Sequence, residues 1–121
     1  MEKTTLILGA SPNPDRFSYK AMRSLQRREI PFIASGLRDV TVGDFTIHKG
    51  IPKKCGPIHT VTLYMSARHQ KDYYKDILAL HPKRIIFNPG TANPELEELA
   101  TKEGINCVRD CMLIMLSNGN Y

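Results

Sequence analysis

One sequence feature constrains the fold of this chain most. It is a short apolar run that leads into a glycine-containing loop and then into a helical pattern. Residues 6–8 form the apolar run, and Gly9 follows where the backbone must turn tightly. The helical pattern then spans residues 19–28, and Ser18 is expected as its N-cap. In such a unit, the loop amides and the positive end of the helix dipole converge above the strand end. The sequence therefore predicts an anion site, suited to a phosphate, at this loop.

Strand and helix patterns alternate along the rest of the chain. We expect strands at residues 6–8, 31–34, 60–64, 84–87 and 105–108, and helices at 19–28, 67–80, 94–102 and 110–116. Residues 37–57 are the least regular part, where 40–42 and 45–47 fit either a hairpin or two loose edge strands. Strands that alternate with helices form βαβ units. The predicted fold class is therefore α/β, a mainly parallel twisted sheet of five or so strands that helices cover on both faces.

Size and composition exclude several classes of protein. The 121 residues predict a single domain over residues 1–121. No apolar run approaches the roughly 18 residues that span a bilayer, and the first residues lack a signal-peptide layout. The three cysteines do not form a disulfide framework or a metal-ligand pattern. We therefore expect a cytoplasmic protein with no membrane contact and no bound metal.

The net charge of +5 raises the question of nucleic acid, but the distribution of charge argues against it. The basic residues are spread along the chain, Trp is absent, and aromatic residues do not alternate with basic ones. Stacking platforms for single strands are thus poorly supplied. A polyanionic small molecule needs fewer cations, so we expect a nucleotide-type ligand and no nucleic acid, while any protein partner stays open.

Three groups of residues, taken in order, resemble one known family. They are Leu-Gly-Ala-Ser-Pro-Asn at 8–13 with Arg16 and Ser18, Asn-Pro-Gly-Thr at 88–91 with Asn-Pro-Glu at 93–95, and Gly-Ile at 104–105 leading to Asp-Cys at 110–111. This pattern resembles the small stand-alone CoA-binding domains, which are similar to the N-terminal CoA-binding domain of the succinyl-CoA synthetase α subunit. The resemblance implies a Rossmann-like three-layer fold with CoA across the C-terminal ends of the parallel strands.

The middle of the chain departs from this family. After the second strand the family usually has a Val-Asn-Pro type of segment, whereas this chain reads Ile-Ala-Ser-Gly at 33–36. At the end of the fourth strand many relatives carry Gln or Glu before the glycine, and here Asn88 and Pro89 stand there. These departures affect the expected contacts to adenine and to the pantetheine arm more than they affect the fold.

The loops at the strand ends are the candidate ligand site, because open α/β sheets bind ligands outside the carboxyl ends of their strands. Gly9 allows close backbone approach, Ser11 and Ser18 offer hydroxyl groups, and Arg16 offers a bidentate fork to a phosphate. The predicted binding residues are Gly9, Ala10, Ser11, Asn13, Arg16, Ser18, Ser35, Tyr64, Asn88, Pro89 and Gly90. A plain strand-to-helix turn is the alternative for residues 9–11.

The identity of the nucleotide follows in part from what the loop lacks. The fingerprint Gly-x-Gly-x-x-Gly is missing, and no acidic residue ends the second strand, so NAD is disfavoured. Arg16 or Arg38 could meet the 2′-phosphate of NADP, and basic loops suit the 3′-phosphate and diphosphate of CoA equally well. CoA or acyl-CoA is therefore the first expectation and NADP the second.

No residue set predicts an active site. No base stands beside Ser11, Ser35 or Ser66 in the sequence, and a serine hydroxyl without a base is a weak nucleophile. His69, three residues after Ser66, is expected to face solvent at a helix start. We therefore expect a CoA or acyl-CoA binding protein without catalytic activity. The alternatives are a small NADP-dependent oxidoreductase and a scaffold with a vestigial nucleotide cleft.

Overall fold

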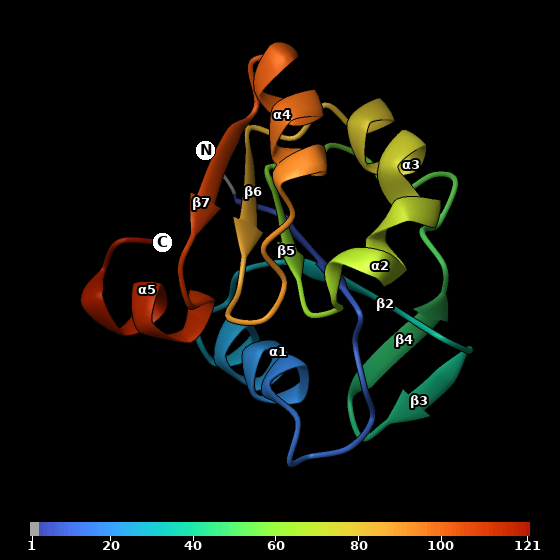
Figure 1. Cartoon of the computed structure of the whole chain (residues 1–121). Helices are drawn as coiled ribbons and strands as arrows, with labels where there is room; N and C mark the ends of the chain where they lie inside the picture. Colours follow the sequence, from blue (N-terminus) through green and yellow to red (C-terminus); the bar gives the residue numbers. More distant parts are fainter. Residues whose placement is uncertain (1–2) are drawn as a thin grey trace.

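The computed structural model describes residues 3–121 and contains one seven-stranded sheet with helices on both faces (Figure 1). The strands are β1 (Thr5–Leu8), β2 (Phe32–Gly36), β3 (Val40–Val42), β4 (Phe45–Lys49), β5 (Thr60–Leu63), β6 (Arg84–Phe87) and β7 (Asn106–Arg109). The helices are α1 (Phe17–Arg27), α2 (Ala67–Gln70), the 3₁₀ turn η1 (Lys71–Tyr73), α3 (Tyr74–Ala79), α4 (Pro94–Lys102) and α5 (Met112–Asn118). The predicted α/β, Rossmann-like three-layer fold is confirmed.

The strand order is β3-β4-β2-β1-β5-β6-β7, and β3 against β4 is the antiparallel pair in an otherwise parallel sheet. From β1 the chain first builds the sheet outward through β2 and then returns to add β5 on the other side. The carboxyl ends of β1 and β5 therefore form a topological switch point, where open α/β sheets bind ligands. Of the two alternatives for residues 40–47, the hairpin is the one that forms.

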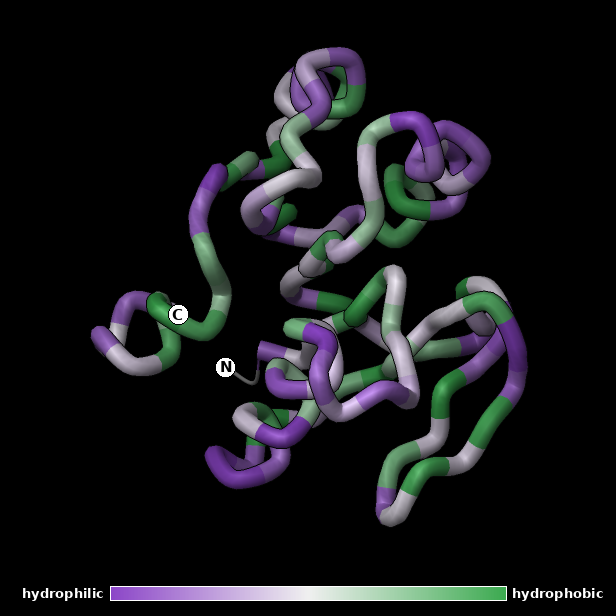
Figure 2. Tube along the Cα trace, turned by 60° about the horizontal axis from the view of Figure 1, so that its bottom comes forward, coloured by the Kyte–Doolittle hydropathy of each residue, from purple (hydrophilic) through white to green (hydrophobic). Residues whose placement is uncertain are grey.

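Two separate apolar layers hold the helices to the sheet. Ile7 packs with α1 and α5 on one face, whereas its neighbours Leu6 and Leu8 pack with α3 and α4 on the other. Both faces of the central strands are thus buried, which explains why β1 reads as a continuous apolar run. Figure 2 shows hydrophobic segments along the central strands, whereas the most hydrophilic segments lie mainly on outer turns and helices. Ala21, Met22 and Leu25 are fully buried, as their helical spacing predicts.

Several boundaries differ from the sequence expectation. Helix α1 begins at Phe17, and Arg16 occupies its N-cap without a side-chain hydrogen bond, so the prediction of Ser18 as N-cap is wrong. The buried Ser18 hydroxyl instead accepts a 3.1 Å hydrogen bond from the Ser11 backbone N–H. Ser35 and Gly36 lie inside β2 rather than after it. The helix expected over 67–80 is divided into α2, η1 and α3.

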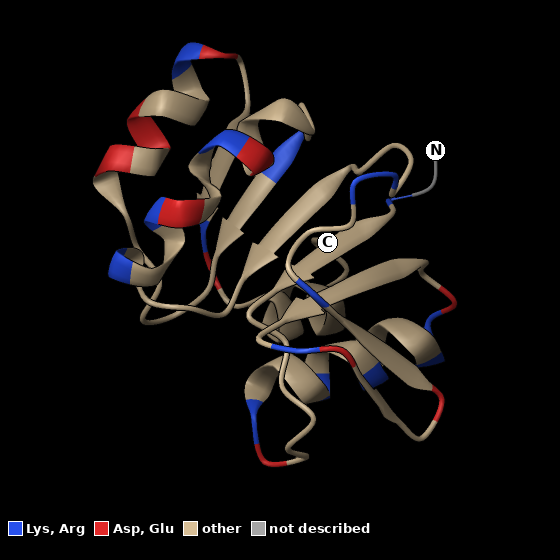
Figure 3. Cartoon of the chain, turned by 90° about the vertical axis from the view of Figure 1, so that its right-hand side faces the viewer, with Lys and Arg blue, Asp and Glu red and all other residues tan. Residues whose placement is uncertain are grey.

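Charged residues lie mainly on helices and loops, and the strands carry few of them (Figure 3). Lys49 on β4 and Arg109 on β7 are exposed, whereas Arg84 on β6 is buried. Arg84 donates a 3.1 Å hydrogen bond to Thr60 Oγ1 and stacks on the Tyr121 ring. Within residues 3–121, no helix combines the length and the apolar character needed to cross a bilayer.

Candidate ligand-binding site

A cavity of about 920 Å³ runs along the carboxyl ends of the parallel strands. Its lining comes from the end of β2, from the loops and helix starts that follow β1, β5 and β6, and from Val40 and Ile47 on β3 and β4. Neighbouring strands lie about 4.8 Å apart, so four spacings give a length of roughly 19 Å. The site is therefore elongated, and it crosses the switch point between β1 and β5.

The β1–α1 loop reaches this site only because glycines permit it. Gly9 has φ +94°, and a Cβ there would lie 3.0 Å from the carbonyl carbon of Tyr64. A Cβ at Gly36 would lie 2.5 Å from the backbone oxygen of Ala10. Glycine at both positions lets three neighbouring strand ends converge.

The amides of this loop are not the phosphate donors that the sequence suggests. The N–H groups of Gly9 and Ala10 both donate to the Ser35 carbonyl oxygen, at 2.9 and 2.8 Å. The N–H groups of Phe17 and Ser18, in the first turn of α1, have no hydrogen-bond partner in the part of the chain that the structure describes. Any anion bound by backbone amides would therefore lie at the helix start.

Three arginines, each after a different strand, line the cavity. Arg16 follows β1, Arg38 follows β2 and Arg68 lies in α2 after β5, and all three are exposed. The ion pairs found within residues 3–121 all involve α4 and none of these arginines. Asp72 contributes the one acidic side chain among the described lining residues. The cavity therefore offers unpaired positive charge at three successive strand ends.

Two buried hydroxyl groups at the cavity wall lack partners. Ser35 is only 1% exposed, and its Oγ has no hydrogen-bond partner among residues 3–121. The Tyr64 hydroxyl is also buried without one. Burial raises the pKa of Tyr64 well above its usual value of 10, so the phenol remains a hydrogen-bond donor at neutral pH. Because unsatisfied buried polar groups cost free energy, a ligand that pairs with Ser35 would recover part of that cost.

Asn88, a predicted binding residue, has a structural role. Its Nδ2 donates to Thr62 Oγ1 at 2.7 Å and to the Leu63 carbonyl at 2.9 Å, and its Oδ1 accepts from the Met112 N–H at 2.9 Å. The side chain is buried, and these contacts use both of its polar atoms. Asn88 therefore shapes the loop after β6 from within, while Pro89 and Thr91 line the cavity.

A buried amide network joins the two walls at this end of the site. Gln70 donates to the carbonyls of Met65 and Thr91, at 2.9 and 2.8 Å. Asn93 donates to Gln70 Oε1 at 2.9 Å and to the Tyr74 hydroxyl at 2.7 Å. Its Oδ1 also caps α4. The loops after β5 and β6 are thereby held as one unit.

Ser66 and His69 form a contact that the sequence analysis did not expect. The Ser66 Oγ lies 3.1 Å from His69 Nδ1, and both exposed side chains line the cavity. The expectation that no serine has a base beside it is therefore wrong for Ser66. The contact is local, because Ser66 is the N-cap of α2 and His69 lies in the first turn of that helix.

The cavity gathers most of the predicted binding residues, namely Gly9, Ala10, Ser11, Arg16, Ser18, Ser35, Tyr64 and Pro89. Asn13, Asn88 and Gly90 lie outside its lining. Lining residues that the predicted set lacked include Phe17, Leu37, Arg38, Met65, Arg68 and Tyr73. Phe17 is 66% and Leu37 91% exposed, so an apolar rim stands beside the arginines. No local sequence signal marks Arg68, because its role depends on where α2 packs.

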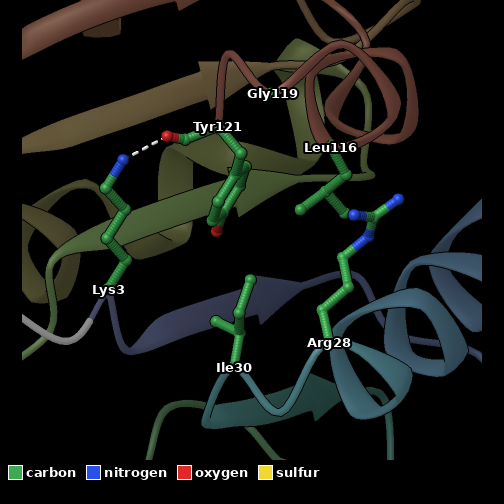
Figure 4. A pocket seen from close by; sticks show the side chains of 6 residues that line it. All are labelled: Lys3, Arg28, Ile30, Leu116, Gly119 and Tyr121. Atoms are coloured by element: carbon green, nitrogen blue, oxygen red, sulfur yellow. Dashed lines mark hydrogen bonds between the residues drawn. The ribbon is translucent and has the colours of Figure 1, made fainter.

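A second, smaller hollow of about 290 Å³ lies away from this site, around Lys3 and Tyr121 (Figure 4). The Tyr121 ring points into it, and its hydroxyl hydrogen-bonds with Thr5 Oγ1. Lys3 donates to the Tyr121 backbone oxygen. Along the described chain, no three His, Cys, Asp or Glu side chains form a group suited to a metal ion.

The sequence also matches a protein family described as "CoA binding domain", over residues 3–117. The chain belongs to this CoA-binding domain family. The match spans both the loops that line the cavity and the sheet that positions them. Membership of this family supports a CoA-type small molecule as the ligand of the protein. No curated protein matches the chain.

Solved structures share the fold of this CoA-binding domain. A crystal structure of an uncharacterized protein is 44% identical, with a TM-score of 0.93 over 100% of this chain and 99% of that one. A hypothetical protein from Pyrococcus horikoshii OT3 is 20% identical, with a TM-score of 0.87 over 97% and 83% of the two chains. A Thermus thermophilus protein, also 20% identical with a TM-score of 0.87, covers 99% and 91%. The last two show the fold alone.

Proposed function

We propose that this protein binds CoA or an acyl-CoA along the strand ends and has no catalytic activity of its own. The observation that carries the proposal is the position of Arg16 and Arg38, which form no ion pair among residues 3–121, at neighbouring strand ends of one elongated cavity. CoA has a diphosphate and a 3′-phosphate, and guanidinium groups bind phosphate oxygens in a bidentate fork. We propose, as the sequence leads us to expect, that residues 1–121 form a single domain and that the protein is cytoplasmic.

The character of the lining changes along the cavity in the order that CoA requires. Leu37, Val40 and Ile47 give an apolar surface at the β2–β4 end, suited to an adenine ring. Arg38, Arg16 and the free N–H groups of α1 follow at the ends of β2 and β1, suited to phosphates.

The β5–β6 end has a mixed lining that includes Met65, Tyr73 and Pro89. Such a surface suits the uncharged pantetheine arm, which combines amide groups with short aliphatic segments. The Ser35 hydroxyl, buried and unpaired among the described residues, lies in the wall between the two ends. Apolar walls with a few placed polar groups are typical of cofactor sites.

The two alternatives differ from this proposal in ligand behaviour. An NADP-dependent oxidoreductase would use the same arginines for its phosphates but would bind NADP in preference to CoA. A vestigial cleft would bind neither, and it would have no need to keep unpaired arginines and an unpaired buried serine. The structure gives no separate observation in favour of either alternative.

A thermal-shift and calorimetric comparison of CoA, acetyl-CoA and NADP tests the proposal. A ligand at about 100 times its dissociation constant adds roughly 2.7 kcal/mol of stability, so CoA should raise Tm and NADP should not. A shift with NADP alone would favour the oxidoreductase, and no shift with any ligand would favour the vestigial cleft.

The Arg16→Ala variant tests the site itself. Charge-assisted hydrogen bonds contribute about 1.5–3 kcal/mol, so affinity for CoA should fall at least tenfold. The Tm of the free protein should not change, because Arg16 is exposed. Arg27→Ala removes the same charge from the far end of α1, outside the cavity lining, and should leave the affinity unchanged. Unchanged affinity in Arg16→Ala would exclude a phosphate contact at Arg16.

A further inference from the structure

The wall of the cavity after β5 carries a positive charge that CoA alone does not explain. Arg68 is exposed, lines the cavity and takes part in none of the ion pairs formed within residues 3–121. Its element follows β5, whereas Arg38 follows β2, and β1 lies between these strands. Two strand spacings, roughly 10 Å, therefore separate the strand ends from which the two arginines extend.

The charges of CoA are all at one end of the molecule. The 3′-phosphate lies on the ribose and the diphosphate lies next to it, whereas the pantetheine arm has only amides, a hydroxyl and the thiol. If the adenosine end lies at β2–β4, Arg38, Arg16 and the α1 amides are placed for the phosphates. The thiol end of the arm, with any acyl group bound to it, then lies toward β5 and β6, where CoA itself presents no charge to Arg68.

We propose that the bound acyl group ends in a carboxylate and that Arg68 binds this carboxylate. The inference rests on the proposed function, because it assumes an acyl-CoA in the cavity. A guanidinium group binds a carboxylate through two parallel hydrogen bonds, a geometry that the ammonium group of lysine does not offer. The ligand class is therefore the CoA thioesters of dicarboxylic acids, in contrast to simple fatty acyl-CoAs.

Two neighbours of Arg68 affect carboxylate binding, His69 in favour of it and Asp72 against it. His69 has Nδ1 held 3.1 Å from the Ser66 hydroxyl, and its Nε2 has no hydrogen-bond partner in the described chain. That ring nitrogen can donate to a carboxylate oxygen. Asp72 lines the same cavity with the opposite sign of charge, so it opposes an anionic acyl group. Removing the Asp72 charge should therefore strengthen binding of that group.

Calorimetric titration with malonyl-CoA, butyryl-CoA and CoA tests the inference. Malonyl and butyryl groups have similar length, but malonyl ends in a carboxylate and butyryl in a methyl group. The wild-type protein should bind malonyl-CoA at least tenfold more tightly than butyryl-CoA. Arg68→Ala should abolish this preference and change the affinities for butyryl-CoA and CoA less than twofold. Arg68→Lys should restore the preference only in part.

Two further variants separate the acyl site from the phosphate site. Asp72→Asn should tighten malonyl-CoA binding and leave butyryl-CoA unchanged. Arg38→Ala, the matched control, should weaken all three ligands by the same factor. Both residues are exposed, so the fold should tolerate these changes, and circular dichroism checks that it does.

Each other outcome overturns the inference in a distinguishable way. Equal loss of all three ligands in Arg68→Ala would assign Arg68 to a phosphate of CoA, and the proposed function would stand. Equal wild-type affinity for malonyl-CoA and butyryl-CoA would likewise exclude the carboxylate site alone. No binding of any of the three ligands would overturn both the inference and the proposed function.

Discussion

The side-chain amide of Asn88, at the end of β6, donates a 2.7 Å hydrogen bond to Thr62 Oγ1 on β5. The same side chain also reaches the backbone of Leu63 and the N–H of Met112 at the start of α5. One buried residue thus connects two strands and a helix directly beneath the loop that carries Pro89. The geometry of the cavity end depends on this connection, although Asn88 lies outside the lining.

Replacing Asn88 should therefore destabilise the protein. Asn88→Ala removes three hydrogen bonds and leaves the Met112 N–H buried without a partner, so the free energy of unfolding should fall by about 3 kcal/mol. Urea denaturation measures this change. Asn106→Ala, at an exposed position on β7, is the control and should change stability by less than about 0.5 kcal/mol. A loss in Asn88→Ala no larger than in the control would contradict the structural role.

Gly9 and Gly90 provide a matched test of the close contact at β1. Both have positive φ, +94° and +88°, so an alanine at either position is strained by about 1–3 kcal/mol. Only at Gly9 would the added Cβ press on the Tyr64 backbone, at 3.0 Å, while nothing lies within 4 Å at Gly90. Gly9→Ala should therefore lower Tm further than Gly90→Ala, in thermal melts followed by circular dichroism. Equal losses would mean that the strand ends can move apart freely.

His59, just before β5, should make stability depend on pH. Burial is the main cause that lowers its pKa below the usual 6.5, and the positive charges of Arg84 and Lys3 add to it. The unfolded chain then binds more protons than the folded one as the pH falls through this range. The contribution of His59 to the free energy of unfolding is therefore fully present above about pH 6.5, where the ring is neutral in both states. This contribution is lost as the pH falls through the lowered folded-state pKa.

The measurement compares the free energy of unfolding at pH 8 and pH 5 in wild type and His59→Gln. The variant should lose less stability between these two values than the wild type loses. An equal or steeper loss in the variant would show that other groups dominate the acid response.

The pair of Ser66 and His69 should not make the protein a thioesterase. The two side chains are exposed, and among the described residues no third group orients the His69 ring, so the hydroxyl remains a weak nucleophile. Thiol release from acetyl-CoA and malonyl-CoA, followed with a chromogenic thiol reagent, should not exceed that of buffer. Turnover that survives purification and disappears in Ser66→Ala would overturn this expectation. It would also overturn the proposal that the protein binds its ligand without catalysing a reaction.

The layered fold was readable from the sequence because it depends on local periodicity. The continuous apolar run of β1 indicated a strand buried on both faces, and the spacing of Ala21, Met22 and Leu25 indicated one buried helix face. Pro94 and Gly104 marked the ends of α4 within about one residue. Such patterns indicate which side of a helix or strand is buried. A few neighbouring residues are enough to show this, because the pattern repeats over a short stretch of chain.

The tertiary structure decided which polar groups of the candidate site have structural partners and which remain free for a ligand. Ser18 and Asn88 looked like ligand contacts in the sequence, yet packing turns their polar atoms toward Ser11 and Thr62. Arg38 and Arg68 share a cavity only because β2 and β5 lie on either side of β1. The sequence by itself determined the α/β sheet and the glycine loop at the carboxyl end of β1. Which polar groups remain free for a ligand depends on contacts between segments far apart in the chain, and local patterns carry no information about those.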